Sequence, residues 1–527
     1  MTLAGHLLSL VALTVVARVV PRLLRPDALS ADAYYHLLAA QRIREHGFRL
    51  PERLRGLFFP GPYDYPPLFH VLLAIVPVPM IARAERVVSI LIDASYVALC
   101  YAFVRYALVV GYEVDGSLAA RRALILAGLL ALSPALLYVG RGPRTYNANP
   151  RILAELLFAG VMATTFVWVM DGGVLALLAA GVLAGVLLLS SKFGAQVLVA
   201  FLPLLALATR RADLLVVPAA GLLVAVIVSR GHYLRVLRGH IGHLTLFGRL
   251  GNERGSPRAE RSEWREFGRL LSSLATPSAW YRLLCVNSIG SFLVRNPQLV
   301  LVALVAPVVA ASTATSLLLS WIVVSLAVFL AISLRPLLFL GEAERYVAYS
   351  VPAQLAVLGA GWESVPSWAW WLLLAYSVVV SAGYQAIFVR LARRDPASLA
   401  QRREVVAFLQ GQPRCRRILP VGEAPHSLAY LSGHEVFYPC GNFQIWETTL
   451  SEYRRIYDEF ARPRLDTLAE TSARYDIDTI LVNKRQDSSI AAALHHYPAL
   501  FENEAYVVYD FSRARDAQVI ASALSQA

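Results

Sequence analysis

Long apolar blocks, separated by polar and charged segments, run through the first three quarters of the chain. A helix that crosses a membrane needs about 20 predominantly apolar residues. A further apolar stretch, 67–81, is short and proline-rich, so we interpret it as a helix lying on the membrane surface. The pattern predicts eleven membrane-spanning helices, at residues 3–21, 87–111, 122–140, 152–170, 173–190, 193–208, 212–229, 297–311, 314–333, 350–363 and 366–391.

Eleven spans place the two ends of the chain on opposite sides of the membrane. The pairs Arg121-Arg122 and Arg210-Arg211 fall in two short loops, which the positive-inside rule assigns to the cytoplasmic side together with the N-terminus. Arg18 at the outer end of the first span disagrees with that rule, as do its neighbours Arg22 and Arg25. This topology predicts a membrane domain at 1–394, an extracytoplasmic tail at 395–527 and outer segments at 24–86, 141–151, 230–296 and 334–349.

The tail shows a different pattern, in which short β-type runs alternate with helical ones. Four strands are predicted at 418–421, 435–438, 479–482 and 505–511, with helices at 452–460 and 465–475. Such alternation is typical of a small α/β domain. The expected fold class is therefore a polytopic α-helical membrane protein that carries a C-terminal α/β domain.

The composition supports the membrane assignment and indicates which classes of binding partner to expect. The chain is 57% hydrophobic and 16% charged, whereas a soluble domain is about 25% charged. This excludes a soluble enzyme, a disordered protein and a nucleic-acid module. The net charge of +13 favours anionic lipid or phosphate as partners, although an arginine bias is also expected from a GC-rich genome.

The first outer segment carries the clearest candidate chemistry. Asp32 and His36 lie four residues apart and share a face of a predicted helix, with Tyr35 between them. A carboxylate and an imidazole on one face suit a divalent cation (Mg²⁺ or Mn²⁺) or a substrate hydroxyl. Alternatively, Ser30 or Asp32 only caps the helix and His36 is a surface residue. Further along, Asp64 and His70 flank a Tyr-Pro-Pro-Leu sequence.

Two other outer segments offer hydrogen-bond donors. Arg141, Arg144 and Asn147 lie in a short segment that contains no acidic residue, and Arg345-Tyr346 lies in the last outer segment. Arginine forks bind phosphate through paired hydrogen bonds. The alternatives are contacts with lipid headgroups and ion pairs with nearby glutamates.

The order of these features resembles the GT-C superfamily of integral-membrane glycosyltransferases. A first span, Asp-x-Tyr-Tyr-His at 32–36, Tyr-Pro-Pro-Leu at 65–68 and a long helix opened by Arg86 carry the resemblance. That superfamily includes the catalytic subunit of oligosaccharyltransferase, protein O-mannosyltransferases and lipid A aminoarabinose transferases, which use polyprenyl-phosphate-linked sugars. The resemblance implies that Asp32 is the essential acidic residue and that Arg345 contacts the carrier phosphate. The chain departs from the pattern because it lacks a second acidic motif at 141–151 and a Trp-Trp-Asp motif.

The expected function is inverting transfer of a sugar from a polyprenyl-phosphate donor at the outer face of a prokaryotic plasma membrane. The acceptor is a glycan, lipid or protein. Asp32 is the expected catalytic base, and Asp32 with His36 would hold any metal; a metal-independent reaction is equally compatible. The rival functions are a transporter or flippase, for which Asp93 and Lys192 are the candidate residues, and a non-catalytic scaffold. The expected substrate-binding residues are Tyr35, His36, Asp64, His70, Arg141, Arg144, Asn147, Arg345 and Tyr346.

Overall fold

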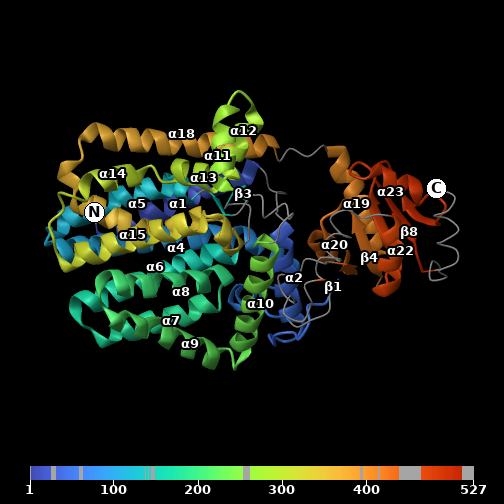
Figure 1. Ribbon diagram of the computed structural model, residues 1–527, viewed down its shortest axis with the longest axis horizontal. Coiled ribbons are helices and arrows are strands. Elements are labelled where there is room, and N and C mark those ends of the chain that lie inside the picture. Colours follow the sequence, from blue (N-terminus) through green and yellow to red (C-terminus); the bar gives the residue numbers. More distant parts are fainter. Residues whose placement is uncertain are drawn as a thin grey trace.

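Long helices lie side by side in one part of the computed structural model, and a mixed sheet with its own helices occupies the other end (Figure 1). The structure describes residues 2–24, 31–58, 63–136, 138–139, 142–143, 149–252, 262–391, 396–412, 416–437, 451 and 465–512.

Each of the eleven apolar blocks overlaps a helix of the structure. By length and composition, five helices in the described part of the chain are able to cross a membrane, or up to seven if two bent helix pairs each count as one span. The prediction of eleven spans is therefore confirmed for helix positions, whereas their number as spans stays a prediction. The helices are α1 (Leu3–Leu24), α4 (Ile81–Tyr112), α5 (Gly116–Leu132), α6 (Pro150–Asp171), α7 (Val174–Leu188), α8 (Lys192–Thr209), α9 (Val216–Val228), α14 (Gln298–Val305), α15 (Thr313–Ile332), α17 (Val351–Ala360) and α18 (Ser367–Leu391).

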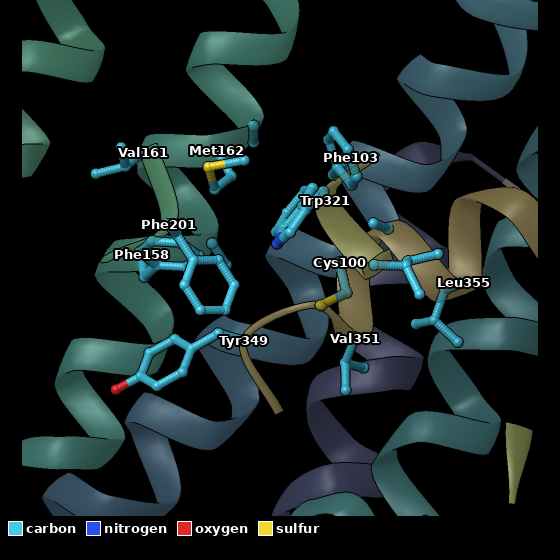
Figure 2. Packing of buried hydrophobic residues seen from close by; sticks show 14 of the residues in the cluster. Cys100, Phe103, Phe158, Val161, Met162, Phe201, Trp321, Tyr349, Val351 and Leu355 are labelled. Carbon is cyan, nitrogen blue, oxygen red and sulfur yellow. The ribbon is translucent and has the colours of Figure 1, made fainter. Parts of the chain in front are cut away.

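Aromatic side chains pack at the centre of the bundle. The Trp321 ring on α15 meets Phe103 and Phe158 edge-on, at centroid distances of 6.0 and 6.4 Å (Figure 2). Phe158 also meets Tyr349 edge-on at 5.1 Å. Edge-to-face pairs of this kind stabilise a core beyond the area they bury, so this cluster fixes α4, α6 and α15 relative to the turn before α17.

Two buried ion pairs connect α1 to α4. Arg18 Nε lies 3.0 Å from Asp93 Oδ2, and Arg22 Nη2 lies 2.9 Å from Glu85 Oε2. A charge in such surroundings needs a partner, because leaving it unpaired is costly. Arg18 and Arg22, which disagree with the positive-inside rule, therefore have a structural role. Asp93, a residue of the transporter hypothesis, forms part of the α1–α4 contact.

Short helices cover the end of the bundle that faces the sheet. The surface-helix prediction for 67–81 corresponds to α3 (Leu68–Ala74), which is far too short to span, and a 3₁₀ turn, η1 (Val78–Met80). The N–H of Leu68 donates to the Leu189 carbonyl at 2.9 Å and so fixes α3 to the α7–α8 turn. The remaining elements are α2 (Ala31–Glu45), α10 (His232–Asn252), α11 (Glu263–Ser272), α12 (Pro277–Cys285), α13 (Ser288–Arg295), η5 (Arg335–Leu340) and α16 (Glu344–Ala348).

The tail contains the predicted mixed α/β structure. Four strands lie where the sequence predicted them, namely β4 (Arg417–Val421), β5 (Glu435–Phe437), β6 (Thr479–Asn483) and β8 (Tyr506–Asp510). The helix predicted at 465–475 is α22 (Leu465–Arg474), whereas 452–460 lies outside the described residues. The elements without a prediction are β7 (Ala499–Glu502), α19 (Pro396–Gln410), α20 (Pro425–Ser432) and α23 (Ser488–Ala493).

The sheet includes a strand from the first outer segment. Its order is β1-β5-β4-β6-β8-β7, and β1 (Leu57–Phe58) pairs in parallel with β5, opposite Val436. Helix α2 packs on α20 in the same region. Leu38 of α2 shares an apolar core with Leu409 and Leu428 of the tail. The first outer segment and the tail therefore pack together, which holds α2 in place.

Candidate functional site

Aromatic and imidazole rings gather where α2, α3 and the segment before α3 meet. We call Tyr35, His36, Tyr63, Tyr65 and His70 the histidine cluster. His36 Nδ1 lies 2.7 Å from His70 Nε2, and the Tyr63 hydroxyl hydrogen-bonds to His70 Nδ1. Tyr65 stacks on His70 at 5.3 Å, and Tyr35 meets His36 edge-on at 5.4 Å. The structure thus brings three predicted site residues together, namely Tyr35, His36 and His70. A fourth, Asp64, is the residue before Tyr65 of the same cluster.

Burial keeps the imidazoles of this cluster neutral. His70 is fully buried, and burial lowers its pKa to about 3. Burial also holds the pKa of His36 well below its usual value, with smaller contributions from His70, Arg151 and His426. Removing an imidazole from water disfavours its charged form. At neutral pH these rings therefore take part in hydrogen bonding without carrying charge.

A carboxylate and an ammonium group lie beside the cluster. Asp64 is fully buried and Lys192, the first residue of α8, is nearly so, and their charges interact. The Lys192 ammonium lies 5.8 Å from the centre of the Tyr65 ring. Helix α10 passes next to Asp64 at Gly239, where an added Cβ would lie only 1.9 Å from Asp64 Oδ2. Asp64 thus lies in the contact between α10 and the histidine cluster.

A small pocket lies where α6, α8, α13 and α16 meet. We call it the arginine pocket, and Arg151, Phe193 and Arg345 carry its chemistry. The guanidinium carbons of Arg151 and Arg345 lie 4.4 and 5.0 Å from the centre of the Phe193 ring. Arg345 pairs with Glu342, whose carboxylate also lies 3.9 Å from Arg151. The lining residues are Arg151, Glu155, Phe193, Arg295, Arg345, Ala348 and Tyr349.

Arg345 has donors left over in this pocket. Its side chain is about nine-tenths buried, yet its Nε and Nη1 have no hydrogen-bond partner among the described residues. Unsatisfied buried donors are costly in a native protein. The adjacent Tyr346 has a different environment, because its buried hydroxyl donates to Gln196 Oε1 at 3.1 Å. The pocket therefore presents donor groups to an anionic ligand, whereas Tyr346 anchors α16 to α8.

The two groups of residues form one site region. The charge of Arg151, which lines the arginine pocket, contributes to the lowered pKa of His36 in the histidine cluster. The consecutive residues Lys192 and Phe193 contribute one side chain to each. Ser191 fixes this arrangement, because it caps α8 by accepting a hydrogen bond from the Phe193 N–H at 3.2 Å.

Several predicted site residues lie outside the described part of the structure. These are the side chain of Asp32 and the residues Arg141, Arg144 and Asn147. Among the described residues, no three His, Cys, Asp or Glu side chains converge as a metal site would need. The divalent cation therefore stays a prediction that rests on Asp32, and we derive no chemical step through a metal.

The structure also adds residues that the sequence predictions did not include. Tyr63, Arg151, Phe193 and Arg295 belong to the two groups, and Lys192 appeared only under the transporter hypothesis. The one signal available for Arg151 was its place at the end of an arginine-rich outer segment. Phe193 carries no such signal, because a phenylalanine in an apolar block is expected to be a core residue.

Comparison with known proteins supports the fold assignment. No protein-family profile matches the sequence, and no curated protein sequence matches it. The structure is similar to ArnT from Cupriavidus metallidurans bound to undecaprenyl phosphate, with a TM-score of 0.61, 13% identity and coverage of 96% of this chain and 98% of that chain. It is also similar to the apo oligosaccharyltransferase of Archaeoglobus fulgidus, with a TM-score of 0.54, 12% identity and coverage of 94% and 73%.

A second structure of the Archaeoglobus fulgidus enzyme, AglB in complex with an inhibitory peptide and a dolichol-phosphate, gives a TM-score of 0.53 at 11% identity. It covers 93% of this chain and 72% of that one. ArnT and AglB are GT-C superfamily membrane glycosyltransferases. The resemblance inferred from the order of short motifs is therefore confirmed at the level of the fold.

Proposed function

We propose that this protein is a glycosyltransferase that takes a sugar from a polyprenyl-phosphate-linked donor at the outer face of the membrane. The observation that carries the proposal is the arginine pocket. Arg345 is buried there, and two of its donor nitrogens have no hydrogen-bond partner among the described residues. The guanidinium of Arg151 lies over the same Phe193 ring and is the second cation of the pocket. Two similar solved structures hold undecaprenyl phosphate and dolichol-phosphate, ligands with the headgroup chemistry that such a pocket suits.

In this proposal the donor phosphate binds against Arg345 and Arg151. As the acceptor oxygen attacks the anomeric carbon, the bond from that carbon to the phosphate oxygen breaks, and its electron pair leaves with the phosphate. Two fixed guanidinium groups would stabilise the charge where it develops. Asp32 would take the proton from the acceptor hydroxyl as a general base. A single displacement of this kind inverts the anomeric centre.

The position of α2 supports this role for Asp32. The residue lies one helical turn before His36, and α2 is held by the tail through Leu38 and by the histidine cluster through His36. A catalytic group works best on an element that cannot shift, because small displacements of the reacting groups cost rate. The packing of α2 between the bundle and the tail meets this requirement.

The test is turnover of a panel of polyprenyl-phosphate sugars by the purified full-length protein in lipid nanodiscs. We expect the wild-type protein to release sugar from at least one donor. The Arg345→Met variant should bind polyprenyl phosphate roughly 10-fold or more weakly, since charge-assisted hydrogen bonds are worth about 1.5–3 kcal/mol each. Asp32→Asn should slow turnover by roughly 100-fold or more while retaining donor binding.

Arg335→Met is the matched control. Arg335 belongs to η5 in the same outer segment and is exposed, so this variant removes the same charge without touching the arginine pocket. Equal loss of binding in the two variants would assign the effect to general surface charge and contradict the proposal. Wild-type turnover in a folded Asp32→Asn protein would remove Asp32 from catalysis.

A further inference from the structure

Three polar groups in the histidine cluster form a continuous hydrogen-bonded chain. It runs from the Tyr63 hydroxyl to His70 Nδ1, across the His70 ring, and from His70 Nε2 to His36 Nδ1 at 2.7 Å. Tyr63 is 1% exposed, His70 is fully buried and His36 is 4% exposed. Water is therefore largely excluded from all three groups, and their hydrogens have to be satisfied by one another.

The direction of this chain follows from counting donors and acceptors. A neutral imidazole has one N–H and one acceptor nitrogen. Among the described residues, the Tyr63 hydroxyl contacts no polar partner other than His70. Its hydrogen must point there, because the opposite direction would leave a buried hydroxyl hydrogen without an acceptor, which is unfavourable. Tyr63 therefore donates to His70 Nδ1.

The remaining protons are then fixed in turn. His70 accepts at Nδ1, so its single hydrogen is on Nε2, and it donates to His36 Nδ1. His36 accepts at Nδ1, so its own hydrogen is on Nε2, the nitrogen at the free end of the chain. A ring nitrogen that carries hydrogen offers no lone pair to a metal ion or to a proton.

We propose that His36 is a neutral hydrogen-bond donor to the bound substrate through Nε2–H, and that His70 and Tyr63 are positioning residues that fix this tautomer. The proposal rests on the proposed function in one respect, namely that the oxygen that accepts this hydrogen bond belongs to the phosphate of the sugar donor. The geometry supports that assignment, because the His36 ring lies 5.8 Å from the Tyr65 ring, which lies under Lys192. The next residue, Phe193, lies under the guanidinium of Arg151 in the arginine pocket.

The spacing of Asp32 and His36 suggested either a metal site or contact with substrate. His36 in this tautomer is a substrate contact and not a metal ligand. A neutral donor has a clear use beside Arg151 and Arg345, because it adds a directed hydrogen bond without adding a third positive charge to a buried site. His70 has no direct contact with substrate in this arrangement and acts only through His36.

The tautomer is measurable without any turnover. Full-length protein labelled with ¹⁵N at histidine, in lipid nanodiscs, gives the protonation state of each ring nitrogen, and the signals of His36 are assigned by their loss in His36→Gln. We expect Nε2 of His36 to be protonated and Nδ1 unprotonated. In Tyr63→Phe the constraint on His70 is lifted, so the opposite tautomer of His36 should appear. An unprotonated Nε2 in the wild-type protein, or an unchanged tautomer in Tyr63→Phe, would overturn the proposal.

Donor binding separates this role from a purely structural one. His70→Gln retains a donor and an acceptor, whereas His70→Phe fills a similar volume with neither. We expect His70→Phe to raise the Kd for polyprenyl phosphate by roughly 10-fold and His70→Gln to restore most of the loss. Equal Kd values in two folded variants would refute the positioning role. If the wild-type protein binds no polyprenyl phosphate, the proposed function fails, whereas the ¹⁵N result still decides the tautomer.

Discussion

The contact between α10 and Asp64 makes a sharp prediction for one glycine. Helix α10 is an amphipathic helix that follows α9 after a bend of 119°. It contacts the histidine cluster through His232, whose ring stacks on Tyr63, and at Gly239 it passes next to the fully buried Asp64. The variant Gly239→Ala adds one methyl group at this point. Any effect of the substitution therefore reports on whether α10 is docked as the structure shows.

The size of the effect follows from the geometry. The added Cβ would lie 1.9 Å from Oδ2, 2.5 Å from Cγ and 2.8 Å from Cβ of Asp64, whereas ordinary contact begins at 3.4 Å. The largest shortfall, 3.4 − 1.9, is 1.5 Å. Rotating the carboxylate alone leaves the Cβ clash, so α10 or the Asp64 segment has to move. Overpacking of this kind costs about 1–3 kcal/mol.

Gly268→Ala is the matched control. Gly268 lies inside α11, and an added Cβ meets no atom within 4 Å. Alanine should therefore stabilise that helix by up to about 1 kcal/mol, since glycine is a poor helix former. The assays are thermal unfolding in detergent and hydrogen–deuterium exchange over 232–252. A Gly239→Ala protein that matches Gly268→Ala in Tm, with unchanged exchange in α10, would refute the docking of α10 on Asp64.

Three further predictions concern stability. Arg18→Leu should cost about 3–5 kcal/mol, because it removes one partner of a buried ion pair, and Arg18→Leu/Asp93→Leu should recover most of the loss in Tm. Burial lowers the pKa of His70 to about 3 in the folded state, against about 6.5 in the unfolded chain. The free energy of unfolding is therefore highest above pH 6.5 and falls by about 2 kcal/mol between pH 7 and 5, because the unfolded chain binds the proton. A plot of Tm against pH should be flatter for His70→Phe, and an identical slope in the two proteins would contradict the burial of His70. Leu38→Ala should cost about 2–5 kcal/mol and speed limited proteolysis of the tail, whereas Leu271→Ala on the exposed side of α11 should do neither.

The fold was predictable where a single segment carries its own signal. The apolar blocks place the bundle helices, and four β-type runs place four strands of the tail. The strand β1 has only two residues, too few for any periodicity, and it forms only because β5 offers an open edge. Similarly, the apolar face of α2 predicts a helix but does not identify Leu409 and Leu428 as its partners.

The candidate site was less predictable because its contacts join short segments that are far apart in the chain. The spacing of Asp32 and His36 correctly places both on α2, yet the hydrogen bond that decides the chemistry of His36 comes from His70, on another helix. Lys192 shows the same limit. Its place at the end of an apolar block is compatible with a transport pathway, and only the fold puts its charge beside Asp64.

The amino-acid composition contains one further indication that Lys192 is special. The chain has 47 arginines and two lysines, so a lysine at the start of an apolar block is unusual within this sequence. An ammonium is a compact charge on a flexible stem, whereas a guanidinium is a wide planar fork. The Lys192 ammonium lies over the Tyr65 ring and beside the buried Asp64, where it acts as one compact charge. In the arginine pocket the preference reverses, since Arg151 and Arg345 lie over a flat Phe193 ring. The shape of each charged group thus fits its surroundings, a distinction that net charge alone does not contain.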